Sequence, residues 1–236
     1  MDKIVAKLDQ IISVKNIMTP VEDMEVATSI EEATPLFVQY DVVPYSKMGL
    51  IEGFFLRDSV AISEMKVDCL ISDSTSLLTL PQLLKQTSFR FVISSDRVAG
   101  YIHYSDLNKP VMKLPLFALM LSVEKQLWDK IKGDITEAIV REVFQGNAQK
   151  FINKQNAARS SNVDIGWIGI FTLPSILKLA KYFEKTNLTG AQEKLLVAIR
   201  NKVSHADKNL IDKQSDVSEL VEAIKLCQLM LKIECD

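Results

Sequence analysis

The sequence has little of what marks the more specialised classes of protein chain. Its 236 residues include 8 glycines and 7 prolines, too few for a collagenous, linker-rich or disordered chain. It has 3 cysteines, with no Cys-x-x-Cys pair, and only 2 histidines. These counts argue against a disulfide framework and against a zinc site, so we predict no bound metal.

Charge of one sign and long apolar runs are also lacking. The chain has 28 Lys and Arg against 30 Asp and Glu, which excludes a strongly basic nucleic-acid coat for the whole chain. The densest apolar run, Leu114–Leu121, is less than half of the roughly 20 residues that a membrane span needs. The N-terminal segment, MDKIVAKLDQIISVKN, is amphipathic and has no apolar signal core. We therefore expect a cytoplasmic protein with no membrane partner.

The pattern of predicted secondary structure changes near residue 110. Residues 1–113 alternate short strand patterns with short helix patterns, and the order of these elements repeats after about 50 residues. Residues 114–236 show longer helical patterns. The sequence therefore predicts an α+β fold, in which two α/β repeats at 14–66 and 67–113 precede an all-α helical bundle at 114–236. Residues 114–236 hold 17 basic and 15 acidic side chains, whereas residues 1–113 hold 11 basic and 15 acidic ones. The second half is therefore the more positive of the two and the better candidate for contact with RNA.

Local signals predict where several elements begin and end. Ser29 and Glu32 have the spacing of a capping box, and Asp58 or Ser59 is expected to open a further helix. In the second half, one helix is expected over 135–153 and a polar loop over 153–164. Further helices are expected at 116–131, at 174–185 and after two more capping boxes at 189–192 and 216–219.

The first half of the chain resembles paired CBS domains over roughly residues 14–113. The resemblance is carried by Ile17-Met18-Thr19-Pro20, by a helix opened by Arg57-Asp58, and by a second copy that ends in Gly100-Tyr101-Ile102-His103-Tyr104-Ser105-Asp106. Paired CBS domains form a compact two-fold module, and many bind adenine nucleotides in clefts between the repeats. The resemblance implies an adenine nucleotide as a regulatory ligand and no catalytic cofactor.

The ligand signature of that family is Gly-h-h-Thr/Ser-x-x-Asp, where h is a hydrophobic residue. Its hydroxyl meets a phosphate and its aspartate holds the ribose, as a carboxylate can accept both ribose hydroxyls. In the first copy Asp58 is present but Phe55 fills the hydroxyl position; in the second, Gly100 and Asp106 are present and His103 fills it. The resemblance thus makes Asp58, His103 and Asp106 candidate ligand residues, with Asp106 expected to matter most. The alternative is that the two aspartates are helix N-caps and that His103 is a half-buried strand residue.

A second motif lies near the end of a predicted helix. The segment Arg200-Asn201-Lys202-Val203-Ser204-His205 resembles the Arg-x4-His motif of HEPN domains. These domains are helical bundles of about the size of residues 114–236, and many are metal-independent ribonucleases that dimerise so that two motifs face one cleft. The resemblance implies an RNA substrate, a homodimer, and catalytic roles for Arg200, Asn201 and His205.

The chemistry of these side chains suits RNA cleavage. RNA cleaves itself when its 2′-hydroxyl attacks the adjacent phosphorus, which needs a proton acceptor and a cation near the phosphorane. His205 can exchange protons near neutral pH, and the permanently charged, forked guanidinium of Arg200 suits phosphate oxygens. Asn201 can orient the phosphate or the imidazole. The alternative is that Arg200 and His205 are solvated or helix-end residues.

Helix geometry limits how these groups can meet. On an ideal helix Arg200 and His205 lie about 140° apart, so they converge only if the helix loosens near Ser204 or if they come from two subunits. Glu124 is a carboxylate within a largely apolar helix, and a buried carboxylate needs a partner. We expect it either to hold Arg200 or His205 in place, which would add it to the catalytic group, or to face water.

Two hypotheses follow for the function. In the first, a CBS pair senses a ligand and regulates a ribonuclease of the HEPN type. In the second, the chain is a non-catalytic scaffold whose helical part dimerises or binds a partner.

Overall fold

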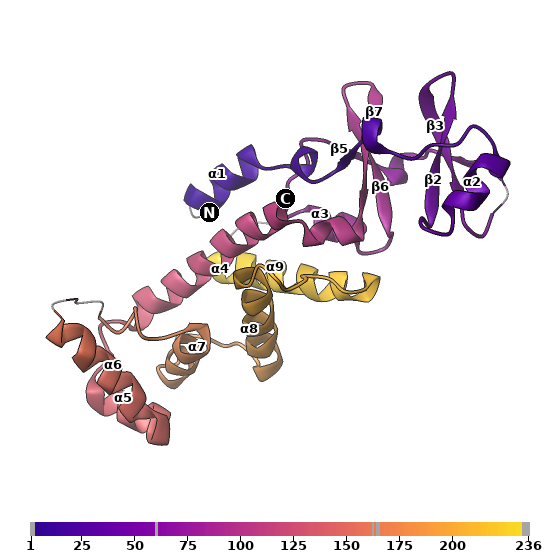
Figure 1. Cartoon of the computed structure of the whole chain (residues 1–236). Helices are drawn as coiled ribbons and strands as arrows, with labels where there is room; N and C mark the ends of the chain where they lie inside the picture. The colour runs from indigo at the N-terminus through magenta and orange to yellow at the C-terminus, as the bar shows by residue number, and fades with distance from the viewer. Residues whose placement is uncertain (1–2, 60, 162, 164–165, 233–236) are drawn as a thin grey trace. The chain divides into compact units, whose positions relative to one another are not determined.

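The structure is a computed structural model that describes residues 3–59, 61–161, 163 and 166–232. Strands occur in the N-terminal part of this described chain and end at His103, and longer helices follow (Figure 1). The chain divides into two compact units. The α/β unit comprises Lys7–Pro115 and Asn209–Val221, and the helical unit comprises chiefly Leu116–Lys208 with the chain from Glu222 onward. The mixed α+β class predicted from the sequence is confirmed.

Two small sheets form the α/β unit. The first has the strand order β1-β7-β6-β5, with β5 parallel to β6 and the other pairs antiparallel. The second is antiparallel and has the order β2-β3-β4. The strands are β1 (Thr19–Pro20), β2 (Val42–Lys47), β3 (Leu50–Leu56), β4 (Ser63–Glu64), β5 (Leu70–Ser72), β6 (Phe89–Ser94) and β7 (Arg97–His103).

Each hairpin pairs with a short strand from elsewhere in the chain. Strand β1, near the start of the first repeat, pairs with β7 of the second repeat, and β4, which lies just before the second repeat, pairs with β3 of the first. A glycine allows each close approach: a Cβ on Gly100 would lie 2.5 Å from the carbonyl oxygen of Thr19, and one on Gly53 would lie 2.7 Å from that of Ser63. Each hairpin also has one register shift at an equivalent place. The shared pairing pattern agrees with the internal repeat visible in the sequence.

Aromatic residues join the two sheets. Phe54 of β3 packs edge-on against Phe89 of β6, with ring centroids 5.3 Å apart, and lies 5.6 Å from the ring of Phe91. Val42 completes this buried cluster. Phe89 and Phe91 are two residues apart on β6 and so share one face of it, whereas on β3 the neighbouring Phe55 belongs to a separate buried cluster.

Short helices cover the sheets. Helix α2 (Ile30–Leu36) begins after Ser29, whose Oγ accepts the N–H of Glu32, and it buries Ala33 against Val43 and Phe55. Helix α3 is Leu80–Leu84. The segment 209–221 belongs to this unit through Asn108, whose amide donates to the carbonyl of Ile211 at 2.7 Å and accepts its N–H at 2.9 Å.

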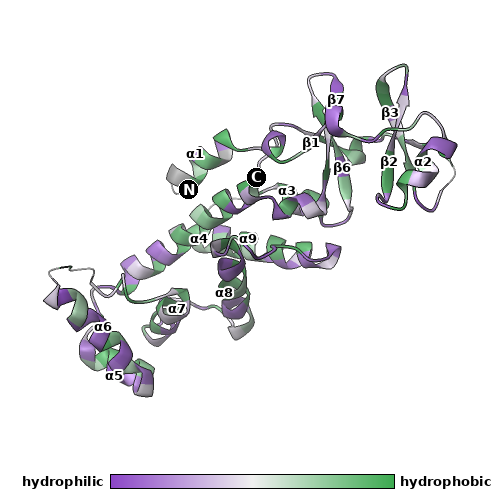
Figure 2. Ribbon diagram, in the orientation of Figure 1, coloured by the Kyte–Doolittle hydropathy of each residue, from purple (hydrophilic) through white to green (hydrophobic). Residues whose placement is uncertain are grey.

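The remaining elements are longer helices. They are α1 (Lys3–Ile11), α4 (Pro110–Ile131), α5 (Glu137–Phe144), α6 (Ala148–Ser160), α7 (Leu173–Tyr182), α8 (Gly190–Ser204) and α9 (Val217–Leu231). Figure 2 shows that α4 is largely hydrophobic in its N-terminal part and more polar toward its C-terminal end. Leu116, Leu119, Met120 and Val123 of α4 are buried. The capping box at Thr189 is confirmed, since its Oγ1 accepts the N–H of Gln192, whose side chain in turn accepts the N–H of Thr189.

Three sequence-based predictions of local structure were wrong. No helix opens at Asp58, because Arg57 and Asp58 form a turn after β3. The single helix expected over 135–153 is interrupted at Gln145, which has a φ of 46°, where Gly146 and Asn147 supply a helix-ending sequence. The expected loop over 153–164 is helical as far as Ser160, and positions 162 and 164 lie outside the described residues.

The length and polarity of the helices decide whether any of them could span a membrane. Across the described ranges, each helix is either too short or too polar to pass through a lipid bilayer.

Candidate functional sites

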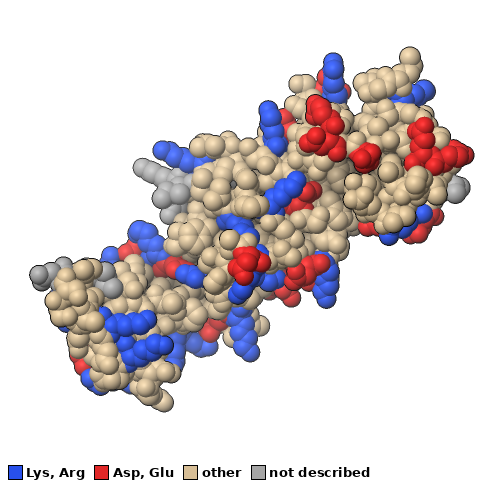
Figure 3. Space-filling view, viewed as in Figure 1, with Lys and Arg blue, Asp and Glu red and all other residues tan. Residues whose placement is uncertain are grey.

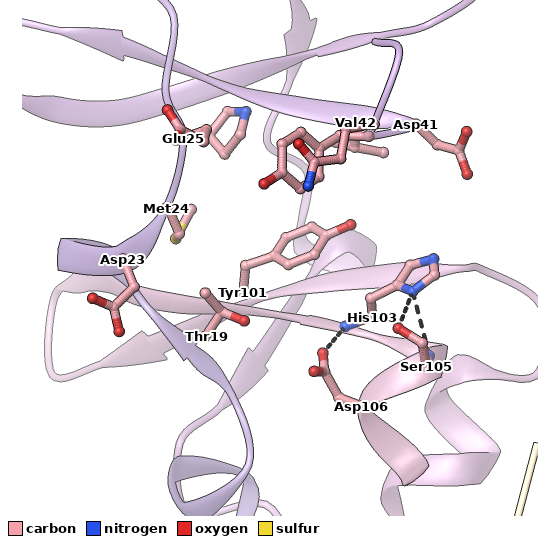
Figure 4. Close-up of a pocket in the computed structure, with 13 residues that line it drawn as sticks. Thr19, Asp23, Met24, Glu25, Asp41, Val42, Tyr101, His103, Ser105 and Asp106 are labelled. Atoms are coloured by element: carbon pink, nitrogen blue, oxygen red, sulfur yellow. Dashed lines mark hydrogen bonds between the residues drawn. The ribbon is translucent and has the colours of Figure 1, made fainter. Parts of the chain in front are cut away.

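A pocket of about 460 Å³ opens in the α/β unit where β1 and β7 meet the segment that leads into β2. Thr19 of β1 and Tyr101 of β7 lie at its base, and Figure 4 shows the Tyr101 ring crossing the middle of the pocket. Asp23 and Glu25 lie on one side, and Asp41, His103 and Asp106 on the other. The exchange of β1 onto β7 therefore places side chains of both repeats around one cavity.

Two of the three predicted ligand residues line this pocket, but Asp106 is already engaged. Its Oδ2 accepts the backbone N–H of His103 at 2.7 Å, and its Oδ1 pairs with Lys109 at 2.9 Å. Its side chain is only 12% exposed. Asp106 thus stabilises the 3₁₀ turn Tyr104–Asn108 that follows β7. It does so as the third residue of a capping box whose N-cap is His103, and not as the N-cap that the alternative supposed.

His103 is held at the end of β7. Its Nδ1 lies 2.8 Å from Ser105 Oγ and accepts the N–H of Ser105 at 3.3 Å. Burial lowers the pKa of His103, while the carboxylates of Asp106 and Asp41 act in the opposite direction. The lowered pKa favours the neutral imidazole at pH 7, which offers no positive charge to a phosphate.

The same two carboxylates also affect the pKa of Tyr101. Burial raises this pKa, and the carboxylates of Asp106 and Asp41 raise it further. The phenol therefore remains protonated at neutral pH and can donate a hydrogen bond into the pocket.

Asp58, the third predicted ligand residue, is exposed and does not line this pocket. The strand register also shows that Asp58 is not the equivalent of Asp106. Gly53 pairs with Glu64 in the β2-β3-β4 sheet as Gly100 pairs with Pro20 in the β1-β7-β6-β5 sheet, so the position equivalent to Asp106 is Ser59. The spacing seen in the sequence is thus offset by one residue from the spacing in the structure.

The second candidate site lies in the helical unit. Arg200 Nε of α8 donates to Glu124 Oε1 of α4 at 3.1 Å, with the two side chains 29% and 15% exposed. Of the two alternatives for Glu124, the structure shows the one in which it pairs with Arg200 rather than facing water. A partly buried ion pair of this kind fixes the guanidinium while its other N–H groups remain available as donors.

The end of α8 sets the position of His205. The helix ends at Ser204, whose Oγ donates to the carbonyl of Arg200 at 2.7 Å, and His205 is extended with φ −109° and ψ 122°. The ideal-helix separation of Arg200 and His205 therefore does not apply, because His205 has left the helix. His205 and Asn201 are both exposed.

The sequence analysis missed several pocket residues. Asp23, Glu25 and Asp41 carry no motif of their own, and only the pairing of β1 with β7 brings them together with the rest of the lining. Thr19 and Tyr101 do belong to segments that carried the resemblance, but neither was singled out as a ligand residue. Within the described residues, no group of three or more His, Cys, Asp or Glu is arranged to hold a metal ion.

Comparison with known proteins finds no similar protein or family. No model of a protein family matches the chain, and no curated protein or solved structure is significantly similar to it.

Proposed function

We propose that the chain is a ligand-sensing protein, in which a CBS-type α/β unit binds a small molecule and regulates a HEPN-type helical unit that cleaves RNA without a metal. The observation that carries the sensing part is the pocket of about 460 Å³, which is large enough for a small organic molecule and combines apolar, aromatic and acidic groups. The adenine nucleotide that the resemblance implies is one candidate occupant.

The Glu124–Arg200 pair supports the catalytic part. A guanidinium held by a carboxylate is positioned to stabilise the charge on a phosphorane through its remaining N–H groups. In the proposed reaction the 2′-hydroxyl attacks the adjacent phosphorus and the 5′-oxygen leaves. His205 transfers the proton, and Asn201 orients the phosphate or the imidazole. The products are a 2′,3′-cyclic phosphate and a 5′-hydroxyl.

The test is incubation of purified protein with total RNA in the presence of a chelator. We expect cleavage that survives the chelator and spares DNA, which lacks the 2′-hydroxyl. His205→Ala should lower the rate by roughly 10²–10⁴, the usual contribution of a positioned acid or base. Arg141→Ala is the matched control for Arg200→Ala, because Arg141 forms an exposed ion pair with Glu137 elsewhere in the helical unit. Cleavage at the wild-type rate by His205→Ala would refute the catalytic assignment.

One observation favours a second candidate, a non-catalytic scaffold that forms a homodimer. Phe117 and Leu121, one turn apart on α4, are 39% and 44% exposed. Large apolar residues on one helix face are typical of a surface that meets another helix. Light scattering tests the dimer: a mass near 26.5 kDa at micromolar concentration would contradict it, and a dimer without RNA cleavage would favour the scaffold.

A further inference from the structure

We infer that the pocket of the α/β unit takes an organic cation, a molecule with one or more ammonium groups on a hydrocarbon body, rather than a nucleotide. This inference rests on the proposed ligand-binding function of the same pocket and specifies the chemical class of the ligand.

The first argument is the charge of the lining. Four carboxylates line the pocket, from Asp23, Glu25, Asp41 and Asp106, and no Lys or Arg among the described residues does. On the face seen in Figure 3, acidic side chains also gather mainly over the α/β unit. A phosphate would enter a field of its own sign, whereas an ammonium group would be attracted.

The second argument is that nearby cations do not reverse this field. Arg57 pairs with Asp41 at 3.0 Å, and Lys109 pairs with Asp106 at 2.9 Å. These two pairs account for two of the four carboxylates. Asp23 and Glu25 remain exposed at the rim, and neither makes a hydrogen bond or ion pair within the described part of the chain. The lining thus keeps two uncompensated negative charges.

The third argument is the rest of the lining. Tyr101 and Tyr40 present aromatic rings, and Met24, Val42 and Pro44 present apolar groups. Aromatic faces attract cations, and the apolar groups suit a hydrocarbon body. His103, the residue at the position where the nucleotide signature has a hydroxyl, is a neutral imidazole at pH 7 and adds no charge for a phosphate.

Isothermal titration calorimetry on the full-length protein tests the inference with four probes: spermidine, putrescine, adenosine and AMP. We expect the amines to bind and to bind more weakly as salt is raised, because the carboxylates at the rim are exposed to screening. The Asp23→Asn/Glu25→Gln double variant should weaken spermidine binding by about tenfold, from the loss of two close charge contacts. The matched control is Glu52→Gln/Asp96→Asn, which removes the same charge from exposed pairs that do not line the pocket and should leave affinity unchanged.

The outcomes separate this inference from the proposed function. AMP or adenosine binding more tightly than the amines, and weakened by Tyr101→Ala, would overturn the cation assignment while supporting a ligand-binding pocket. Equal loss of spermidine binding in both double variants would show that only the net charge of the protein matters, and would also overturn the cation assignment. Binding of none of the four probes would count against both the inference and the proposed sensing function.

Discussion

The ion pair between Glu124 and Arg200 gives the sharpest test of the helical unit. Replacing Glu124 with glutamine keeps an oxygen that can accept the N–H of Arg200 but removes the negative charge. The guanidinium would then remain partly buried with a weaker partner. We expect both lower stability and, if the unit cleaves RNA, a less well-positioned arginine.

The size of the effect follows from the exposure of the two side chains. Exposed ion pairs contribute about 0.2–1 kcal/mol, and breaking a fully buried pair costs about 3–5 kcal/mol. Arg200 and Glu124 are 29% and 15% exposed and share a single 3.1 Å contact, which places them between these limits. We therefore expect a coupling energy of about 1–2 kcal/mol.

A double-mutant cycle with Glu124→Gln and Arg200→Gln measures this coupling directly. Both tryptophans of the chain, Trp128 and Trp167, lie in the helical unit, so urea unfolding followed by tryptophan fluorescence reports on that unit. A coupling energy below about 0.3 kcal/mol, within the additivity expected of independent sites, would refute the view that Glu124 positions Arg200.

Three further predictions concern the α/β unit. Burial lowers the pKa of His103, so just below the ordinary histidine pKa of about 6.5 the unfolded chain binds more protons than the folded one. The free energy of unfolding should therefore fall as the pH drops through that value. His103→Gln should make the melting temperature depend less steeply on pH between pH 7.5 and 5.5. Asn108→Ala should cost about 2–3 kcal/mol in urea unfolding followed by circular dichroism, since it leaves both backbone groups of the buried Ile211 without their partner; a loss below about 0.5 kcal/mol would contradict this. Gly100→Ala should lower the free energy of unfolding by about 1–3 kcal/mol, because the added Cβ would meet the Thr19 carbonyl. Gly146→Ala should not, because nothing lies within 4 Å of the Cβ added there. Equal melting temperatures for the two variants would count against the pairing of β1 with β7.

The sequence predicted much of the fold because its signals are local. The short strand patterns of residues 1–113 agree with the strands found there, and Ser29 and Thr189 cap the helices that they were expected to cap. The errors came where local signals compete. The small polar residues after Asn153 are typical of a loop, yet they continue α6, since Ile152 and Gln155 are buried and tie that helix to its neighbours.

The candidate sites were less predictable because they depend on contacts between distant segments. Glu124 and Arg200 could be paired from the sequence only as one of two options, because burial and not spacing decides whether a carboxylate seeks a partner. The pocket depends on β1 crossing to β7, which no sequence spacing reveals. Asp23 and Glu25 belong to no motif, so nothing in the sequence pointed to them.

The register of the two sheets explains why the two repeats differ in chemistry. Because Gly53 and Gly100 hold equivalent positions, Phe54 takes the place of Tyr101, and Leu56 takes the place of His103. Phe54 is buried against the aromatic rings of β6, so the first repeat uses this position for the core that joins the sheets. Tyr101 also packs against Phe89 and Phe91, but in the second repeat both Tyr101 and His103 line the pocket. Equivalent strand positions thus serve only the core at Phe54, and both the core and the pocket at Tyr101.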